Sequence, residues 1–138
     1  MIFSGGDKVE VSSQADGFVG SYFSATVMSE LMNEGYVVQY MRLLKEDMSS
    51  PLREIVAADE VRPFPPKILA TEFRLGDKVD AFANDGWWVG KITGKNGAKY
   101  FVYFETTGDE IAYPVSHLRV HQEYVDGKWV SSKNRVLC

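Results

Sequence analysis

Two histidines spaced four residues apart come nearest to a catalytic or metal-binding pattern in this chain. The segment from His117 to His121 lacks the glutamate that accompanies two such histidines in zinc-protease helices. The sequence also contains no P-loop and no nucleophile elbow. Its single cysteine, Cys138, excludes an internal disulfide and a cysteine-based metal cluster, and it fits a reducing compartment. We therefore expect a protein that is not an enzyme and that needs no metal or cofactor.

Aromatic and acidic side chains are the other residues that could do chemistry. The chain contains 8 Phe, 7 Tyr and 3 Trp, including the pair Trp87-Trp88 and the run from Tyr100 to Phe104. Rings placed around a cation attract it, each by roughly 0.5–2 kcal/mol, and a carboxylate beside them adds charge attraction. Rings in a small β-protein more often form the core, so their role depends on the elements that carry them.

Those elements occur twice along the chain, which is the strongest organisational signal in the sequence. The offset between the two copies shrinks from 70 to 57 residues, and it changes only between matching blocks. The insertions of the first copy therefore lie in connections, where β-proteins tolerate them. Four blocks recur: residues 3–11 as 73–81, 22–27 as 87–92, 36–40 as 100–104, and 60–63 as 117–120 around a shared arginine.

Each copy has the pattern of short β-strands. Residues 76–82 alternate apolar and polar side chains, and residues 87–93 and 99–104 are rich in aromatic and β-branched residues. Asn84-Asp85-Gly86 and Lys95-Asn96-Gly97 are turn signals of the kind that close hairpins. The pattern predicts an all-β protein built of small barrels or sandwiches, with residues 27–33 as a strand followed by a loop.

A proline-rich stretch separates the two copies. Proline cannot donate to a sheet ladder, so Pro63-Phe64-Pro65-Pro66 ends the first copy. We predict domains at residues 3–66 and 70–130. Units of this size bury only about 60% of their unfolded surface, so we expect the two to pack as one body. Residues 124–130 are predicted to form a hairpin, or a strand that covers a sheet edge.

The composition is that of a folded protein with an acidic balance. Hydrophobic residues make up 45% of the chain, the net charge is −4 and the pI is about 5.2. No apolar run approaches the roughly 20 residues of a membrane helix, and the N-terminus lacks a signal-peptide pattern. The charge favours a basic partner such as a Lys/Arg-rich peptide over a nucleic acid. We expect a monomer, and the sequence leaves open whether the chain is a piece of a longer protein.

The motifs of both copies, taken together, resemble the plant Agenet domain. Residues 76–121 carry Gly-Asp-Lys-Val-Asp-Ala-Phe, Asn-Asp-Gly-Trp-Trp-Val-Gly, Tyr-Phe-Val-Tyr-Phe and His-Leu-Arg-Val-His. Residues 6–11, 16–18 and 51–54 resemble the first member of an Agenet pair. The resemblance covers about residues 3–130. It implies an all-β fold of two tandem SH3-like (Tudor-like) barrels packed as one body.

The resemblance also implies a function in the nucleus, as a chromatin reader without small-molecule or membrane partners. Multi-Agenet plant proteins of this kind bind dimethylated lysine nine of the histone H3 tail. They act in heterochromatic gene silencing that is linked to DNA methylation. The expected partner is therefore an N-terminal histone H3 peptide, held by an aromatic cage and acidic contacts.

Tudor-like cages use the end of the first strand, the start of the second and the end of the third. In the second domain the resemblance places Phe82, Trp87 or Trp88, and Phe104 there. Adjacent strand residues face opposite ways, and we favour Trp88 over Trp87. In the first domain the matching set is Tyr22, Phe23 and Tyr40, with Ser12 in place of an aromatic and room for a side chain from the insertion. The acidic residues expected to contact the peptide are Asp16, Glu46, Asp47, Glu54, Asp85, Glu105, Asp109 and Glu110.

Three alternatives remain open at the level of sequence. A Tudor-like barrel with exposed rings can stack single-stranded RNA, although an acidic surface opposes phosphate contacts. The chain can also be a peptide-interaction module that ignores methylation, for example by strand addition. A methylarginine reader is a close relative of the leading hypothesis. The sequence does not say which barrel carries a working cage.

Overall fold

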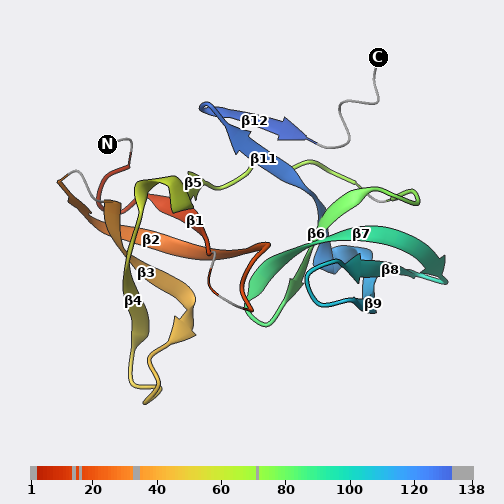
Figure 1. Ribbon diagram of the computed structural model, residues 1–138, viewed down its shortest axis with the longest axis horizontal. Helices are drawn as coiled ribbons and strands as arrows, with labels where there is room; N and C mark the ends of the chain where they lie inside the picture. Colours follow the sequence, from red (N-terminus) through yellow and green to blue (C-terminus); the bar gives the residue numbers. More distant parts are fainter. Residues whose placement is uncertain (1–2, 14, 16, 33–34, 71, 132–138) are drawn as a thin grey trace. The chain divides into compact units, whose positions relative to one another are not determined.

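The computed structural model describes residues 3–13, 15, 17–32, 35–70 and 72–131. The chain divides into two compact units, residues 1–64 and residues 65–138. The division falls inside the proline-rich stretch. The described residues form β-strands and short 3-10 turns without an α-helix (Figure 1). The predicted all-β class with two tandem Tudor-like units is confirmed.

The first unit is a bent antiparallel sheet. Its strands follow the order β4-β3-β2-β1-β5, and a 3-10 turn at Ala58–Glu60 leads into the last strand (Figure 1). The long connection between β1 and β2 is one of the predicted insertions. The strands are β1 (Lys8–Ser12), β2 (Ser21–Leu31), β3 (Gly35–Leu44), β4 (Pro51–Val56) and β5 (Val61–Pro63).

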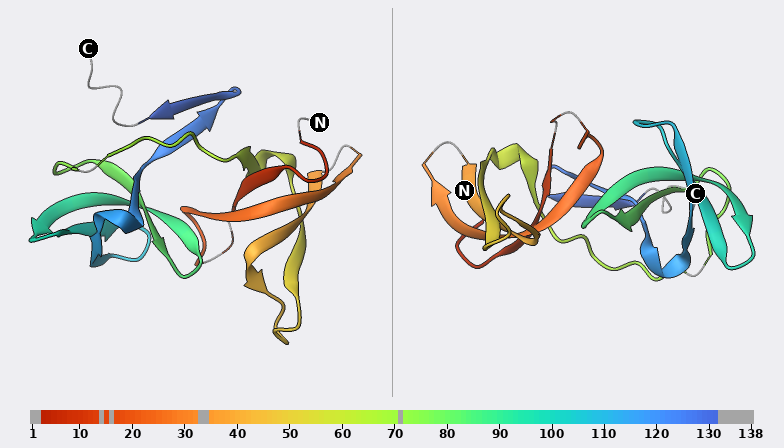
Figure 2. Two further views of the ribbon diagram at one scale, coloured as in Figure 1. Left: turned by 180° about the vertical axis from the view of Figure 1, so that it is seen from behind. Right: turned by 90° about the horizontal axis from the view of Figure 1, so that it is seen from below.

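The second unit repeats this order as β9-β8-β7-β6-β10, again with a 3-10 turn, at Val115–His117, before the last strand. A two-stranded hairpin follows, drawn in blue in Figure 2. The strands are β6 (Lys78–Ala83), β7 (Gly86–Asn96), β8 (Lys99–Phe104), β9 (Asp109–Pro114), β10 (Leu118–Val120), β11 (Gln122–Val125) and β12 (Lys128–Ser131).

The sequence repeat is also a repeat of backbone hydrogen bonds. The amide of Gly6 donates to the carbonyl of Val27 at 2.8 Å, and Gly76 donates to Ile92 at the same distance. Each second strand is then interrupted by a bulge, after Val27 in β2 and after Ile92 in β7. Because a bulge twists and bends its strand, both sheets curl at the same point.

The predicted turns of the second unit close its hairpins. Asn84 and Asp85 both have positive φ, 50° and 65°, and form the two-residue turn between β6 and β7. Such turns match the right-handed twist of the flanking strands. Gly97 has φ 62° in the turn between β7 and β8. Residues 27–31 continue β2, as expected for a strand.

Inward-facing residues of each sheet form that unit's own core. In the second unit, Val79, Ala81, Ile92, Val102 and Val120 are at most 2% exposed. Trp88 and Tyr113 pack against this cluster while remaining partly accessible. Each unit therefore encloses apolar residues from several strands and presents partly covered rings at its margin.

The predicted tail hairpin is present. β11 and β12 pair with each other, and Tyr124 and Trp129 lie opposite one another with ring centroids 5.0 Å apart. Gln122 Nε2 donates to the carbonyl of Pro66 at 2.8 Å, which ties the start of the hairpin to the segment before β6. Within the described ranges, no helix is long and apolar enough to cross a lipid bilayer.

Candidate functional site

The strand register of the second unit decides which predicted cage residues share a face. Trp88 lies opposite Ala81 of β6, which is buried in the core, whereas Trp87 lies opposite Phe82. Since neighbouring strand residues point to opposite faces, Trp88 faces inward and the Phe82–Trp87 pair faces outward. The structure therefore divides the four predicted residues into two groups, and Phe82 does not join Trp88 and Phe104.

The inward group of the second unit consists of Trp88, Phe104 and Tyr113, here called the second ring cluster. The Phe104 and Tyr113 rings meet edge to face with centroids 6.2 Å apart. Trp88 packs against the same core, and its indole Nε1 donates to the carbonyl of Ala83 at 2.7 Å. That bond fixes the orientation of the indole. Tyr113 is a residue that the repeat could not reveal, because Val56 occupies the matching place in the first unit.

A glycine makes room for this cluster. A Cβ added at Gly90 would lie 2.4 Å from Val102 Cγ1 and 3.2 Å from Phe104 Cδ1. Real Cβ atoms do not approach other atoms so closely. Val102 and Phe104 therefore pack close to the backbone of β7, at a position where a side chain would displace them.

The outward group of the second unit already holds a cation of its own. Phe82 and Trp87 meet with centroids 5.1 Å apart, and the guanidinium carbon of Arg119 lies 4.2 Å from the Trp87 ring centroid. Arg119 Nε in turn donates to Asp80 Oδ2 at 2.8 Å, and Asp80 is fully buried. Trp87 therefore has a structural role, as the ring on which Arg119 stacks.

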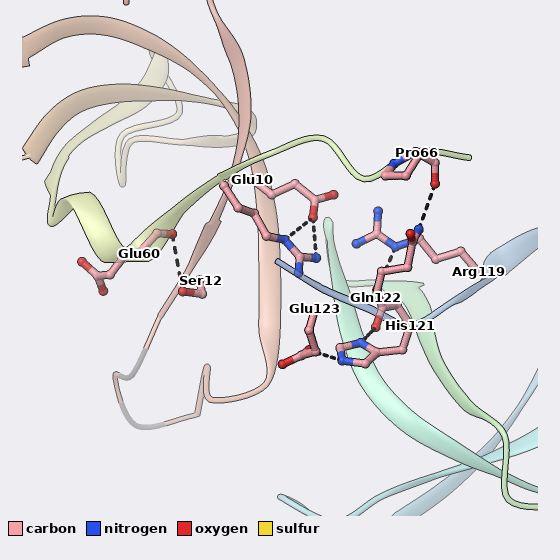
Figure 3. A network of polar contacts seen from close by, with 10 residues as sticks. Glu10, Ser12, Glu60, Pro66, Arg119, His121, Gln122 and Glu123 are labelled. Carbon is pink, nitrogen blue, oxygen red and sulfur yellow. Dashed lines mark hydrogen bonds and ion pairs between the residues drawn. The ribbon is translucent and has the colours of Figure 1, made fainter. Parts of the chain in front are cut away.

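The first unit repeats the arginine stack. Arg62 donates twice to Glu10 Oε1, at 3.1 and 2.8 Å, and its guanidinium carbon lies 3.5 Å from the Tyr22 ring centroid. Glu10 is 2% exposed. Ser12, the residue opposite Tyr22, also lies on this face and donates to the carbonyl of Glu60 (Figure 3). Tyr22 therefore belongs with Arg62 and does not join Phe23 and Tyr40.

The inward group of the first unit contains three rings, Phe18, Phe23 and Tyr40, here called the first ring cluster. Phe23 meets Tyr40 edge to face at 6.4 Å between centroids, and Phe18 meets Phe23 at 6.1 Å. Phe23 and Tyr40 are buried, whereas Phe18 is 45% exposed. Phe18 comes from the β1–β2 insertion, where the sequence predicted a contribution without naming the residue.

A carboxylate completes the first ring cluster. The Tyr40 hydroxyl donates to Glu54 Oε1 at 2.7 Å, and Glu54 itself is exposed on β4. Burial raises the pKa of Tyr40, and the hydrogen bond to Glu54 raises it further. The tyrosine therefore stays neutral and keeps donating, which holds one carboxylate oxygen beside the rings.

The other predicted acids lie at varied distances from the rings. Asp109 lies opposite Phe104, and burial followed by the charge of Asp109 raises the pKa of Tyr113. Asp47 accepts bonds from the side chain and the amide of Ser49, which lower its pKa within its own loop. Glu110 accepts a bond from Thr93. Glu46, Asp85 and Glu105 are exposed in loops or turns, and Asp16 lies outside the described residues.

The two histidines have different surroundings. His121 is 3% exposed; its Nδ1 lies 2.7 Å from Asp80 Oδ1 and its Nε2 contacts Glu123 (Figure 3). His117 is exposed in the 3-10 turn. Among the residues that the structure describes, no three His, Cys, Asp or Glu side chains gather as a metal ion would require. His121 thus joins the buried polar network under Arg119.

Comparison with known families decides what kind of module this is. The Agenet domain model matches residues 6–66 and residues 76–131, which include both ring clusters. The chain belongs to the Agenet domain family. A crystal structure of AGD34 of Arabidopsis thaliana AGDP1 matches with a TM-score of 0.89 at 36% identity, covering 94% of this chain and 89% of that chain. The crystal structure of tandem Agenet domain 3-4 of ADCP1 matches with a TM-score of 0.85 at 34% identity, covering 94% and 87%.

Curated relatives of this tandem Agenet chain are much longer proteins. The chain is 38% identical over 129 residues to the Arabidopsis thaliana protein AGENET DOMAIN (AGD)-CONTAINING P1, with 93% of this chain and 25% of the relative covered. It is 34% identical over 131 residues to DUF724 domain-containing protein 6 of the same plant, covering 91% and 19%. The Agenet pair therefore spans a quarter or less of the length of these relatives.

Membership of the Agenet family indicates the general class of function. Agenet domains share the Tudor-like fold of chromatin-associated readers, and tandem Agenet domains are peptide-binding modules. In this Agenet pair, each unit has a cluster of inward-facing rings that includes one ring from its third strand, Tyr40 in β3 and Phe104 in β8. In the first unit, a carboxylate lies against those rings.

Proposed function

We propose that this Agenet pair reads a methylated lysine on the basic histone H3 tail, best matched by dimethylated lysine nine. In this proposal the chain acts in the nucleus, within heterochromatic silencing. The rings hold the methylated ammonium, and acidic residues hold the flanking cations. The observation that carries the proposal is the first ring cluster with Glu54 bound to the Tyr40 hydroxyl.

A methylated ammonium suits such a site for simple physical reasons. It keeps its positive charge but loses hydrogen-bond donors, so water solvates it less well than a bare ammonium. A ring in contact with the cation contributes on the order of 0.5–2 kcal/mol through cation–π attraction and contact with the methyl groups. Phe18, at 45% exposure, is the ring that a ligand meets from solvent.

The carboxylate of Glu54 favours intermediate methylation. A dimethylammonium retains one N–H, which can donate to the Glu54 oxygen that does not accept from Tyr40. A trimethylammonium has no N–H to give. The site is therefore expected to prefer a dimethylated over a trimethylated lysine, and either over the unmodified side chain.

The charge of the chain supports a basic tail as the wider partner. At a net charge of −4 the protein attracts a lysine- and arginine-rich segment before contact is made. Histone-reader affinities near micromolar correspond to about −8 kcal/mol, which a few rings and charged contacts supply. No larger interface needs to be assumed.

A calorimetric titration tests the proposal. N-terminal histone H3 peptides with zero, one, two or three methyl groups on lysine nine are compared against the same protein. We expect the dimethylated peptide to bind at least about tenfold more tightly than the unmodified one, a difference of about 1.4 kcal/mol. If all four peptides bind alike or fail to bind, the proposal fails. Single-stranded RNA at two salt concentrations is then the next titration, because phosphate contacts weaken steeply with salt.

A further inference from the structure

The second unit has an apolar hollow beside the start of β8. Its volume is about 370 Å³, near the lower end of the roughly 300–1,000 Å³ typical of ligand sites. Tyr100 lines it near the start of β8, whereas Phe104 ends the same strand. The lining residues are Phe73, Leu75, Ile92, Thr93, Gly94, Lys95 and Tyr100.

The internal repeat provides a comparison for this hollow, because the first unit builds the same corner from other residues. The amide of Phe3 donates to the Tyr36 hydroxyl at 3.2 Å, and the amide of Phe73 donates to the Tyr100 hydroxyl at 3.2 Å. The backbone frame is therefore the same. Leu75 of the second unit corresponds to Gly5 of the first, where an added Cβ would lie only 3.3 Å from the carbonyl oxygen of Met28.

The charge at this corner is reversed between the units. Lys95 lies opposite Tyr100 in the strand register, and Glu30 lies opposite Tyr36 in the matching place. The Lys95 ammonium lies 5.4 Å from the Tyr100 ring centroid, above the hollow's aromatic wall. The second unit thus combines an exposed leucine and a cation where the first has a glycine and an anion.

The chain around the hollow is basic within an acidic protein. Residues 86–104 contain Lys91, Lys95 and Lys99 and no Asp or Glu. Arg74 precedes Leu75, and its side chain is exposed. The nearby acids are Glu72, Asp77, whose carboxylate accepts the amide of Arg74, and Glu110, which accepts a bond from Thr93.

We propose that this hollow is a second peptide site, which takes an apolar side chain flanked by carboxylates from an acidic partner segment. The apolar side chain lies between Leu75 and Tyr100, and the carboxylates pair with Lys95 and its basic neighbours. A partner of this chemistry is opposite in charge to a histone tail. The Agenet pair would then join two peptides of opposite charge.

A nucleic acid fits the hollow less well, although it too is an anion. Stacking of bases requires exposed ring faces, but Tyr100 is 3% and Phe73 is 7% exposed. These two rings meet edge to face at 5.5 Å between centroids, so neither offers an open platform. The walls instead match an aliphatic or aromatic side chain that enters between them.

Fluorescence anisotropy with a labelled peptide tests the proposal. The probe is a capped hexapeptide of sequence Asp-Asp-Leu-Phe-Asp-Asp, compared with one in which Ser-Ser replaces Leu-Phe and with an oligothymidylate. Lys95→Glu and Leu75→Gly install the residues of the first unit. We expect each variant to bind the Leu-Phe peptide about tenfold more weakly than the wild type does. The wild type should bind the Ser-Ser peptide about tenfold more weakly than the Leu-Phe peptide. Lys128→Glu makes the same charge change on β12 and should leave affinity within about twofold.

Three results would overturn the proposal. The first is the absence of saturable peptide binding up to about 1 mM. The second is an equal loss of peptide affinity in Lys95→Glu and Lys128→Glu. The third is an oligothymidylate that binds more tightly than the peptide and displaces it. Loss of folding is checked by circular dichroism; Leu75 is 75% exposed and Lys95 is also exposed, so both variants are expected to fold. Binding of the methylated histone peptide is measured in parallel, so the two proposals can fail separately.

Discussion

At the scale of single residues, a buried carboxylate in each unit holds the arginine that covers an outward-facing ring. Glu10 and Asp80 each hold an arginine, and that arginine covers Tyr22 or Trp87. A buried ion pair need not stabilise a fold, but removal of one partner leaves the other uncompensated. The stack places Tyr22 and Trp87 against arginines of the chain itself; their part in ligand binding stays a prediction.

The Glu10–Arg62 pair gives the first prediction. Glu10→Ala leaves a nearly buried guanidinium without its carboxylate and is expected to destabilise the protein by about 3 kcal/mol. Urea denaturation measures this loss. The double variant Glu10→Leu with Arg62→Met removes both charges and should recover part of the stability. A double variant less stable than Glu10→Ala would contradict this account, because it would show that the uncompensated charge of Arg62 is not what destabilises Glu10→Ala.

The carboxylate of the first ring cluster gives a prediction about methylation order. Glu54→Gln keeps the shape but removes the charge beside Tyr40, and Glu54 is exposed, so the fold should tolerate it. The preference for dimethylated over trimethylated lysine should fall to about twofold or less, because the N–H acceptor is weakened. Calorimetry with both peptides checks this. Asp47→Asn, in a loop acid bonded to Ser49, is the control and should keep the preference.

At the scale of elements, β7 shows how a strand is shaped to carry the site. Gly90 lets Phe104 and Val102 pack against its backbone, whereas the nearest atom to a Cβ at Gly94 would be Phe101 Cδ2 at 3.4 Å. Gly90→Ala is therefore expected to cost about 1–3 kcal/mol through overpacking, while Gly94→Ala should cost much less. Chemical denaturation of the two variants tests the difference. Equal stability of both would show that β8 gives way to the extra methyl group.

The strands and turns could be predicted because their signals are local. The matching blocks located the strands, and Asn84-Asp85 marked a turn that its positive φ values confirm. The grouping of rings could not be predicted in the same way. Phe82 lies opposite Trp87, and this pairing depends on the strand register, which the sequence does not state.

Two ring residues were missed for related reasons. Phe18 lies in an insertion that has no counterpart in the second copy, so the repeat gave it no position. Tyr113 corresponds to Val56, so the comparison between copies marked it as an ordinary strand residue. Its place beside Phe104 arises from the hairpin of β8 and β9, which brings residues 104 and 113 to one face.

At the scale of the whole molecule, the chain is two copies of one small fold with separate cores. The proline-rich stretch that was expected to separate the copies, residues 63–66, contains the division between Phe64 and Pro65. The domain limits of 3–66 and 70–130 stay predictions. The Agenet family model itself matches residues 6–66 and 76–131. The expectation that the two copies pack as one body also stays a prediction.

Independent folding of the copies is the next prediction. Each unit has the same strand order and its own buried residues, so residues 1–64 and residues 65–138 should each fold when produced alone. Domains of about this size are only marginally stable, so both should unfold at low urea concentration but cooperatively. Circular dichroism during a urea titration measures this. A half that lacks a cooperative transition would show that its fold depends on the other half.

The central claim is that the first ring cluster recognises the methyl groups, and Phe18 tests it most directly because it is exposed and comes from a loop. The measurement is the calorimetric affinity ratio between dimethylated and unmodified lysine-nine histone H3 peptides, in the wild type, in Phe18→Ala and in Val19→Ala. Val19 is the matched control, a 42% exposed neighbour in the same insertion. We predict a ratio of at least about ten in the wild type and Val19→Ala, and a ratio near one to three in Phe18→Ala. A ratio that survives in Phe18→Ala would place recognition outside the first ring cluster, and a ratio of one in the wild type would contradict methyl-lysine reading altogether.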